Sequence, residues 1–305
     1  MYGCMGSISH AIIQSYSLEI TQSCDHAFII STPFPPSPHF PISPFPHLPL
    51  SPSPHLPMPP PPHPSFSCNS WASFLNMNTK NYYQEKLAAQ QLVKCYQIAP
   101  PRVRQYLAAE LSHVLEKIKP GDKVLDLGCG FGRVIPELAQ KAAAVVGIDN
   151  SSASLILARE KIRHIPTCSL VQANALHLSF KNNSFDVVIG IQNSISAFHV
   201  DQKELIKESL RVTKPGGIVL FSSYADKFWK HRLEWFHLQA DAGILGEIDY
   251  EKTRDGVIIC KDGFTATTVN PGQFLSLTSD LGVKVSIVEV DGSSIFCEMA
   301  PIAPH

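Results

Sequence analysis

The chain has 305 residues and carries 25 Lys and Arg against 26 Asp and Glu, and this near balance argues against a nucleic-acid-binding protein, which is usually basic. Its eight cysteines include no Cys-x-x-Cys pair, so free thiols in a reducing cytoplasm are the simplest account and no metal site is expected. No run approaches the ~18 apolar residues of a membrane span, and no secretory signal is indicated.

Residues 1–76 differ in composition from the rest of the chain. They contain no Lys or Arg and only two acids, and Pro-His recurs at a spacing of eight residues from Pro38-His39 to Pro62-His63. Such a segment cannot build a core, so we expect a disordered low-complexity tail followed by one domain over 77–305. Two interpretations stay open: a polyproline II spacer whose histidines loosely hold metal, or a translated DNA repeat upstream of a native start at Met77. We favour the second.

Two helices, a buried strand and a glycine turn are predicted between Tyr82 and Arg133. Pro100-Pro101 separates the helices, and the second helix ends near Ile118. A short apolar run from Val124 leads into Asp126-Leu127-Gly128-Cys129-Gly130-Phe131-Gly132. Three glycines at alternating positions let the backbone bend sharply and approach a ligand without Cβ atoms in the way.

Two classes of cofactor use such a turn. The dinucleotide fingerprint requires Gly-x-Gly-x-x-Gly, and counting from Gly128 and Gly130 its third glycine falls on Arg133. What remains, Asp-x-Gly-x-Gly-x-Gly, resembles the first motif of the class I S-adenosylmethionine-dependent methyltransferases. The resemblance implies S-adenosyl-L-methionine as the cofactor, bound against this turn.

Two further segments fit the spacing of this family. Residues 143–149 are predicted to form the second strand, which ends in Asp149, 17 residues after Gly132. A carboxylate at this place is expected to bind both hydroxyls of the cofactor ribose. Residues 169–172 are predicted to form the third strand, followed by Asn174, where the family often has an aspartate that contacts adenine. The asparagine can accept a hydrogen bond from the adenine amine and donate one to a ring nitrogen.

The fold class expected is α/β: a Rossmann-like, doubly wound, seven-stranded sheet with a C-terminal antiparallel hairpin. Residues 184–190 are predicted as the fourth strand, and the turn Lys214-Pro215-Gly216-Gly217 feeds a fifth strand over 218–221. A helix at about 271–281 and strands over 283–290 and 294–299 close the chain.

Ligands of open α/β sheets bind at the carboxyl ends of the strands. By this rule and by the resemblance, the cofactor-binding residues expected are Asp126, Gly128, Cys129, Gly130, Gly132, Asp149, Asn150, Asn174, Ala175 and Gln192. The N-terminal helices of the family often cover the cofactor. Tyr82 and Tyr83 are therefore expected either to contact its methionine end or only to pack the lid.

The methyl acceptor leaves weaker signals. His199, just after the fourth strand, is the candidate general base, although a structural role beside the helix-capping Asp201 is favoured. In the helix over 225–243, a core stripe is expected from the spacing of Trp229, Leu233, Phe236 and Ala240. The acceptor pocket is expected to include Asn193, Phe228 and Trp235. An insert at about 244–270, with a hairpin at Asp262-Gly263, is expected to roof it.

Methyl transfer from a sulfonium is an in-line displacement that needs positioning and exclusion of water more than catalytic groups. The predicted function is therefore methyl transfer to a small-molecule acceptor, with neither nucleic acid nor membrane as partner. The Asn-Pro-Pro-Tyr motif of amino-group methyltransferases is absent, since Gln192-Asn193-Ser194-Ile195 occupies that region. The alternative is a catalytically silent S-adenosylmethionine-binding module that regulates a partner. Aminopropyl transfer on the same fold is disfavoured because no paired acids lie at that edge.

Overall fold

The computed structural model describes residues 28–29, 82 and 86–302. Most of the predicted tail therefore lies outside the described residues. The helices are α3 (Ala89–Gln97), α4 (Pro101–Lys117), α5 (Ile135–Ala139), α6 (Ser152–Ile162), α7 (Ser194–Ala197), α8 (Gln202–Val212), η1 (Asp226–Phe228), α9 (Trp229–Asp241) and α10 (Pro271–Thr278). In the part of the chain that the structure describes, none of them is long and apolar enough to cross a membrane.

One mixed sheet forms the centre of the fold. Its order is β1-β4-β3-β2-β5-β6-β10-β9. The strands are β1 (Phe28–Ile29), β2 (Lys123–Leu127), β3 (Ala144–Asp149), β4 (Cys168–Gln172), β5 (Phe185–Gly190), β6 (Thr213–Tyr224), β9 (Val283–Val290) and β10 (Ser294–Pro301). Strands β4, β3, β2, β5 and β6 are parallel, and β10 pairs antiparallel with both β6 and β9. The seven predicted strands and the C-terminal hairpin are confirmed.

Two features of the sheet differ from the prediction. The two-residue strand β1 adds an eighth strand, antiparallel to β4, from a segment predicted to lack structure. Strand β6 begins at Thr213, earlier than predicted, and includes the proline-glycine turn, where Gly216 has a φ of +77°. Lys214 in this turn forms an ion pair with Asp186 of β5 at 2.8 Å, which joins the entries of the two strands.

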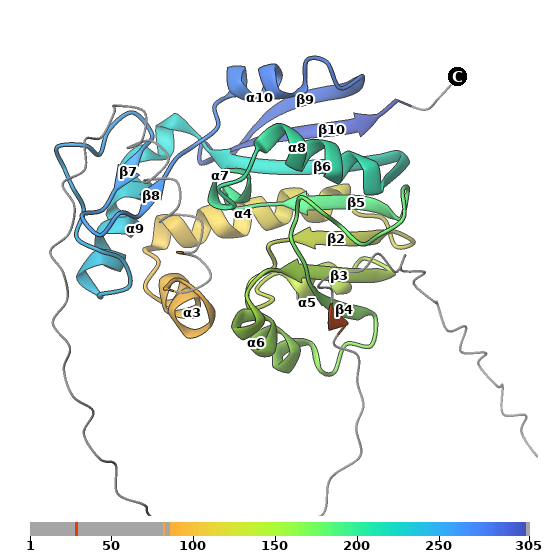
Figure 1. Ribbon diagram of the computed structural model, residues 1–305, viewed down its shortest axis with the longest axis horizontal. Helices are drawn as coiled ribbons and strands as arrows, with labels where there is room; N and C mark the ends of the chain where they lie inside the picture. Colours follow the sequence, from red (N-terminus) through yellow and green to blue (C-terminus); the bar gives the residue numbers. More distant parts are fainter. Residues whose placement is uncertain (1–27, 30–81, 83–85, 303–305) are drawn as a thin grey trace, which may run out of the picture.

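Alternating side chains of the strands build a core on each face. Val124, Val145 and Val187 face a cluster formed with α4, α5 and α6, while Leu125 and Val188 face a second cluster formed with α8 and α10. Parallel strands covered on both faces need apolar residues at nearly every position, and these strands supply them. The result is a three-layered α/β/α domain (Figure 1).

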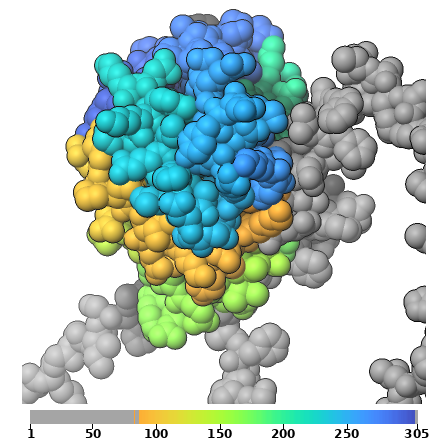
Figure 2. All heavy atoms as spheres, turned by 90° about the vertical axis from the view of Figure 1, so that its left-hand side faces the viewer, coloured from red at the N-terminus to blue at the C-terminus, as the bar shows by residue number. Residues whose placement is uncertain are grey.

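A third cluster lies off one end of the sheet. It joins α3, α9 and the hairpin of β7 (Ile258–Ile259) and β8 (Thr265–Ala266), which gather at the left of Figure 1. Figure 2 shows this end of the molecule, with α9 and the insert in cyan and blue lying over α3 in orange. The antiparallel β7–β8 pairing confirms the predicted hairpin.

All four residues of the predicted core stripe of α9 belong to the third cluster or pack against it, although the most buried face of the helix is turned from this stripe. Of its four residues only Phe236 is buried, and the other three are partly buried. The fully buried face is formed by Arg232, Trp235, Phe236 and Gln239. Arg232 donates to the carbonyls of Gly256 at 2.7 Å and Ala266 at 3.0 Å, so a charged side chain inside the domain anchors the insert to α9. Apolar periodicity could not reveal this face, because half of it is polar.

Candidate functional site

The glycine turn after β2 is shaped by positive φ angles. Gly128 and Gly130 have φ of +72° and +54°, a region that residues with a Cβ rarely adopt. A Cβ on Gly128 would lie 2.5 Å from Cε1 of Phe198, so a larger residue would also collide with the wall of the site. The turn brings the Gly130 amide to Oδ2 of Asp149 at 2.9 Å, which ties β2 to the end of β3.

Asp149 is fixed by backbone amides on both oxygens. Oδ1 accepts from the Ser151 amide at 2.8 Å, and Ser151 in turn caps α6 by accepting from the Ser154 amide. Burial raises the pKa of Asp149, and the backbone hydrogen bonds oppose this shift. A carboxylate has about four lone-pair sites, and the backbone amides of Gly130, Ser151 and Asn150 use three of them, so about one remains for a donor from a ligand.

Two adjoining cavities open at the carboxyl ends of the parallel strands. The larger measures about 210 Å³ and the smaller about 50 Å³. The larger is lined on one side by the predicted cofactor residues Gly128, Gly130, Asp149, Asn150, Asn174, Ala175 and Gln192. The smaller lies around Asp126, Cys129 and Arg133, and shares Gly128, Gly130, Gln192 and Tyr96 with the larger. Gly132 lines neither cavity, and its amide closes the turn on the Cys129 carbonyl at 2.9 Å.

Asp126 is a buried carboxyl group that lines the smaller cavity. Its side chain is 3% exposed, and its Oδ2 has no hydrogen-bond partner among the described residues. Burial raises the pKa of Asp126 to about 7, with Arg133 opposing the shift and Asp149 adding to it. A buried carboxyl oxygen without a partner is costly, and a cationic ligand group would relieve that cost.

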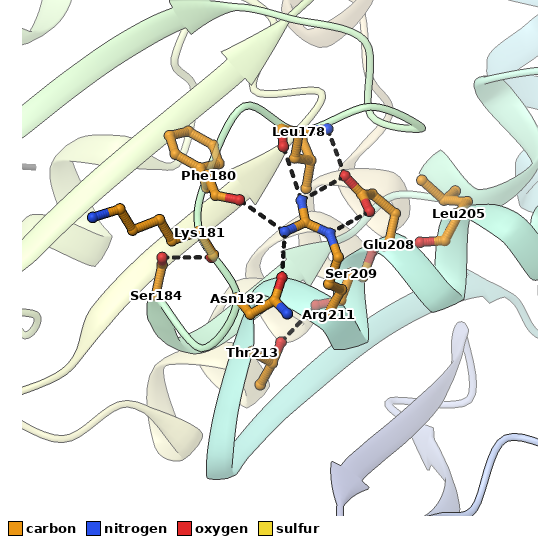
Figure 3. A network of polar contacts seen from close by, with 10 residues as sticks. All are labelled: Leu178, Phe180, Lys181, Asn182, Ser184, Leu205, Glu208, Ser209, Arg211 and Thr213. Carbon is orange, nitrogen blue, oxygen red and sulfur yellow. Dashed lines mark hydrogen bonds and ion pairs between the residues drawn. The ribbon is translucent and has the colours of Figure 1, made fainter. Parts of the chain in front are cut away.

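The segment after β4 that the sequence predicts to lie beside adenine, the adenine-side segment, is held from its far end. Arg211 of α8 donates to the carbonyls of Leu178 and Phe180 and to Oδ1 of Asn182, each at 2.8 Å, and pairs with Glu208 (Figure 3). Glu208 accepts from the Leu178 amide at 2.6 Å. At the near end Asn174 Oδ1 accepts from the Leu176 amide at 2.9 Å, so its side-chain NH₂ is the group left to donate to a ligand.

The opposite wall of the larger cavity is apolar and aromatic. It comes from α3 and the segment before it, from the end of β6 and from α9, and consists of Leu87, Leu92, Cys95, Tyr96, Tyr224, Trp235, Phe236 and Gln239. Trp235 donates from Nε1 to the Cys95 carbonyl at 2.9 Å, which joins α9 to α3 across this wall. None of these side chains carries a charge, so this half of the cavity suits an uncharged molecule.

The structure brings only one of the predicted acceptor residues, Trp235, to the cavity lining. Phe228 lies behind Tyr224, with parallel rings 6.1 Å apart. Asn193 instead donates to the Thr267 carbonyl and accepts from Ser223 Oγ, both at 2.8 Å. The predicted insert contributes no residue to either cavity lining and backs α9 instead, so it does not roof the site.

The candidate base and the candidate lid tyrosines also lie away from the lining. His199 lies between the lining residues Phe198 and Val200 but does not line the cavity itself, and burial lowers its pKa. Tyr82 donates to Oδ2 of Asp262 in the insert hairpin at 2.9 Å and lines neither cavity. Tyr83 lies outside the described residues.

Several lining residues were missed by the sequence prediction. Tyr224 lies three residues after the predicted fifth strand and is the last residue of β6, so the rule for carboxyl ends of strands was a usable signal for it. Cys95, Tyr96, Phe236 and Gln239 offered no such signal, because the prediction of their helices did not say which helix face would meet the cavity.

Comparison with known proteins agrees with this geometry. Residues 124–217 match the family described as a methyltransferase domain. Over these residues the chain carries a methyltransferase domain that is similar to the class I S-adenosylmethionine-dependent methyltransferases. The methyltransferase match begins at β2 and ends in the turn of β6, and so spans the glycine turn, Asp149 and Asn174. S-adenosylmethionine is the cofactor of this domain.

The methyltransferase domain also has curated relatives and a structural counterpart. It is 36% identical over 119 residues to cycloartenol-C-24-methyltransferase from Arabidopsis thaliana, covering 38% of this chain and 33% of that protein. It is 33% identical over 109 residues to demethylmenaquinone methyltransferase from Lysinibacillus sphaericus, covering 34% and 44%. The chain thus spans less than half the length of these relatives. A Pyrococcus horikoshii structure, 21% identical, covers 73% of this chain and 99% of its own with a TM-score of 0.51, which supports the fold.

The residues present fit the cofactor. Asp126 offers an oxygen without a hydrogen-bond partner among the described residues, Asp149 keeps an acceptor site for a hydroxyl group, and the glycine turn brings backbone without Cβ atoms to the edge of the cavities. An unpaired carboxyl oxygen suits the ammonium group of an amino acid, a free acceptor site suits a ribose hydroxyl, and backbone without Cβ atoms lets a ligand come close.

Proposed function

We propose that this chain transfers the methyl group of S-adenosylmethionine to a small, uncharged and largely apolar acceptor. The observation that carries the proposal is the larger cavity, whose polar wall has the features of a donor site while its facing wall is apolar, aromatic and without charge. The relatives named for methyl transfer to cycloartenol and demethylmenaquinone support a small-molecule acceptor. The domain over 77–305 is proposed as the unit that acts, in a reducing compartment such as the cytoplasm.

In this proposal the protein acts by positioning and by excluding water. The bound cofactor supplies an electrophilic methyl group, and the leaving thioether needs no proton. Asp149 orients the ribose, Asp126 and the glycine turn hold the methionine end, and Asn174 with Ala175 faces the adenine. Tyr96, Trp235 and Phe236 hold the acceptor against the donor and keep water out. His199 remains a candidate general base that would need to turn toward the cavity.

The test is release of S-adenosylhomocysteine by the purified full chain. The chain is incubated with S-adenosylmethionine and metabolite extracts fractionated by charge and polarity, with Asp149→Ala as the matched inactive control. We expect turnover in uncharged, apolar fractions. Turnover only in strongly charged fractions would contradict the acceptor class. Tight cofactor binding without turnover in any fraction would favour the silent regulatory module instead.

A further inference from the structure

Glu110, on α4, is a carboxylate with none of its surface exposed. Its Oε2 accepts from the backbone amide of Gln192 at 3.0 Å, and its Oε1 accepts from Ser294 Oγ at 2.9 Å. Burial raises the pKa of Glu110 to about 7, and the Ser222 and Ser294 hydroxyls, Arg133 and the Gln192 amide oppose the shift. An apolar side chain would fill the same space without a desolvation penalty, so the carboxylate has a role beyond packing.

The backbone that Glu110 holds is strained. Gln192 and Asn193 follow β5 with φ of +58° and +62°, two successive left-handed residues that are not glycine. Residues other than glycine rarely adopt this conformation, and they keep it only when the surrounding structure fixes them. Glu110 fixes the first through its amide, and Asn193 is fixed by its own side chain, which bonds to the Thr267 carbonyl and Ser223 Oγ at 2.8 Å each.

This turn decides where the Gln192 side chain lies. Gln192 lines both cavities, and its amide group is hydrogen-bonded to the hydroxyl of Tyr96. Tyr96 belongs to α3, on the apolar wall, and the Arg133 guanidinium lies 5.1 Å from the centre of its ring. The Gln192–Tyr96 contact therefore joins the segment after β5 to α3 across the boundary between the cavities.

We propose that Glu110 is a positioning residue of the cofactor site: by accepting the Gln192 amide it holds the left-handed turn after β5, and with it the contact between Gln192 and Tyr96. Glu110 itself touches neither the cofactor nor the acceptor. The inference rests on the proposed function only in taking the larger cavity as the donor site. It explains why a buried acid on a packing helix faces the end of β5.

Affinity for S-adenosylhomocysteine tests this role, measured by isothermal titration calorimetry on the full chain. Glu110→Leu places an apolar side chain there and removes both acceptor oxygens, and we expect binding weaker by about tenfold or more, since a buried amide is left unpaired. Glu110→Gln keeps an acceptor oxygen for the Gln192 amide, and we expect it to restore affinity to within about threefold of wild type.

The matched control is Glu298→Leu. Glu298 of β10 pairs with Lys117 at 2.7 Å and with His113 at 2.8 Å. Its replacement therefore disturbs the packing of α4 on the sheet, as Glu110→Leu does, but removes no contact with Gln192. We expect it to lower thermal stability but to leave affinity unchanged. Equal affinity of folded Glu110→Leu and wild type, or equal losses in Glu110→Leu and Glu298→Leu, would overturn the proposal.

Hydrogen exchange gives a second measurement that needs neither the leucine variant nor the cofactor. In wild type and Glu110→Gln without ligand, the peptide that contains the Gln192 amide is expected to exchange slowly, because this amide is bonded to a buried acceptor. Exchange as fast as in an exposed loop would overturn the proposal. Failure of wild type to bind S-adenosylhomocysteine would instead refute the proposed function, and the exchange result would still decide the role of Glu110.

Discussion

The pKa of Asp126 leads to a specific prediction for cofactor binding. In the free protein burial raises this pKa to about 7, so the carboxyl is largely neutral in mild acid. Only the ionised form attracts the ammonium group of the cofactor, so binding must remove the proton. The ionised fraction rises from about 0.1 near pH 6 to about 0.9 near pH 8. Affinity for S-adenosylhomocysteine should therefore rise about tenfold over this range, or about 1.4 kcal/mol.

Asp126→Asn is the perturbation that isolates this carboxyl. The amide is nearly isosteric and neutral at every pH, so we expect the pH dependence to vanish and the affinity near pH 8 to fall by about tenfold or more. Calorimetric titrations of wild type and variant at several pH values between about 6 and 8 measure both effects. Glu110→Gln serves as the control, because Glu110 titrates in the same range but does not line either cavity.

Two results would refute this reasoning about Asp126. The first is an affinity of wild type that does not change with pH, which would mean that the carboxyl is already ionised or does not meet the ammonium group. The second is an unchanged pH dependence in Asp126→Asn, which would assign the proton to another group. A slope that disappears in Glu110→Gln but persists in Asp126→Asn would identify that group as Glu110.

Four further predictions concern the glycine turn, the acceptor wall, the adenine-side segment and stability. Gly128→Ala should abolish detectable S-adenosylhomocysteine binding, whereas Gly243→Ala, with a similar φ of +67° and nothing within 4 Å of a Cβ, should keep it; equal behaviour in calorimetry would contradict the steric argument. Trp235→Leu should reduce release of S-adenosylhomocysteine with cofactor affinity nearly unchanged, and Trp229→Leu, away from the lining, should not; equal turnover would remove Trp235 from the acceptor wall. Arg211→Ala should cost about 2 to 3 kcal/mol in chemical denaturation because three carbonyl or amide oxygens lose their donor, while Lys203→Ala at an exposed ion pair should cost under about 0.5 kcal/mol. Finally, burial raises the pKa of Glu110 above its ordinary value, so the neutral form stabilises the fold and this stabilisation is lost as the pH rises through about 7. The thermal unfolding temperature of wild type should therefore fall as the pH rises toward about 7, and that of Glu110→Gln should fall less. Identical pH profiles of the two proteins would contradict this reasoning.

Much of the donor half of the site could be predicted from the sequence. The positions of Asp126, the glycines and Asp149 follow from local rules, because a turn with positive φ needs glycine and parallel strands present their carboxyl ends at one edge. Asn174 lines the larger cavity as the sequence predicts, and its Oδ1 accepts one hydrogen bond from the Leu176 amide, which leaves its NH₂ group free to donate to a ligand.

Of the predicted acceptor residues the structure brings only Trp235 to the cavity lining, and the reason is physical. Phe228 and Trp235 are both aromatic residues in the same segment, yet one lies behind Tyr224 and the other lines the cavity. Which side of α9 faces the cavity depends on how Arg232 binds carbonyls of the insert, contacts separated by 24 and 34 residues in the chain. No local pattern contains such information.

By itself the sequence determined the succession of strands along the chain, the glycine turn after β2 and the acid at the end of β3, because each is encoded by neighbouring residues. Only the tertiary structure decided that Glu110 binds the Gln192 amide, that the Tyr96 hydroxyl bonds to the Gln192 side chain, and that the insert packs against α9 without lining the cavities. These features depend on which side chains share a buried environment after folding, and burial across long chain separations sets both their contacts and their pKa values.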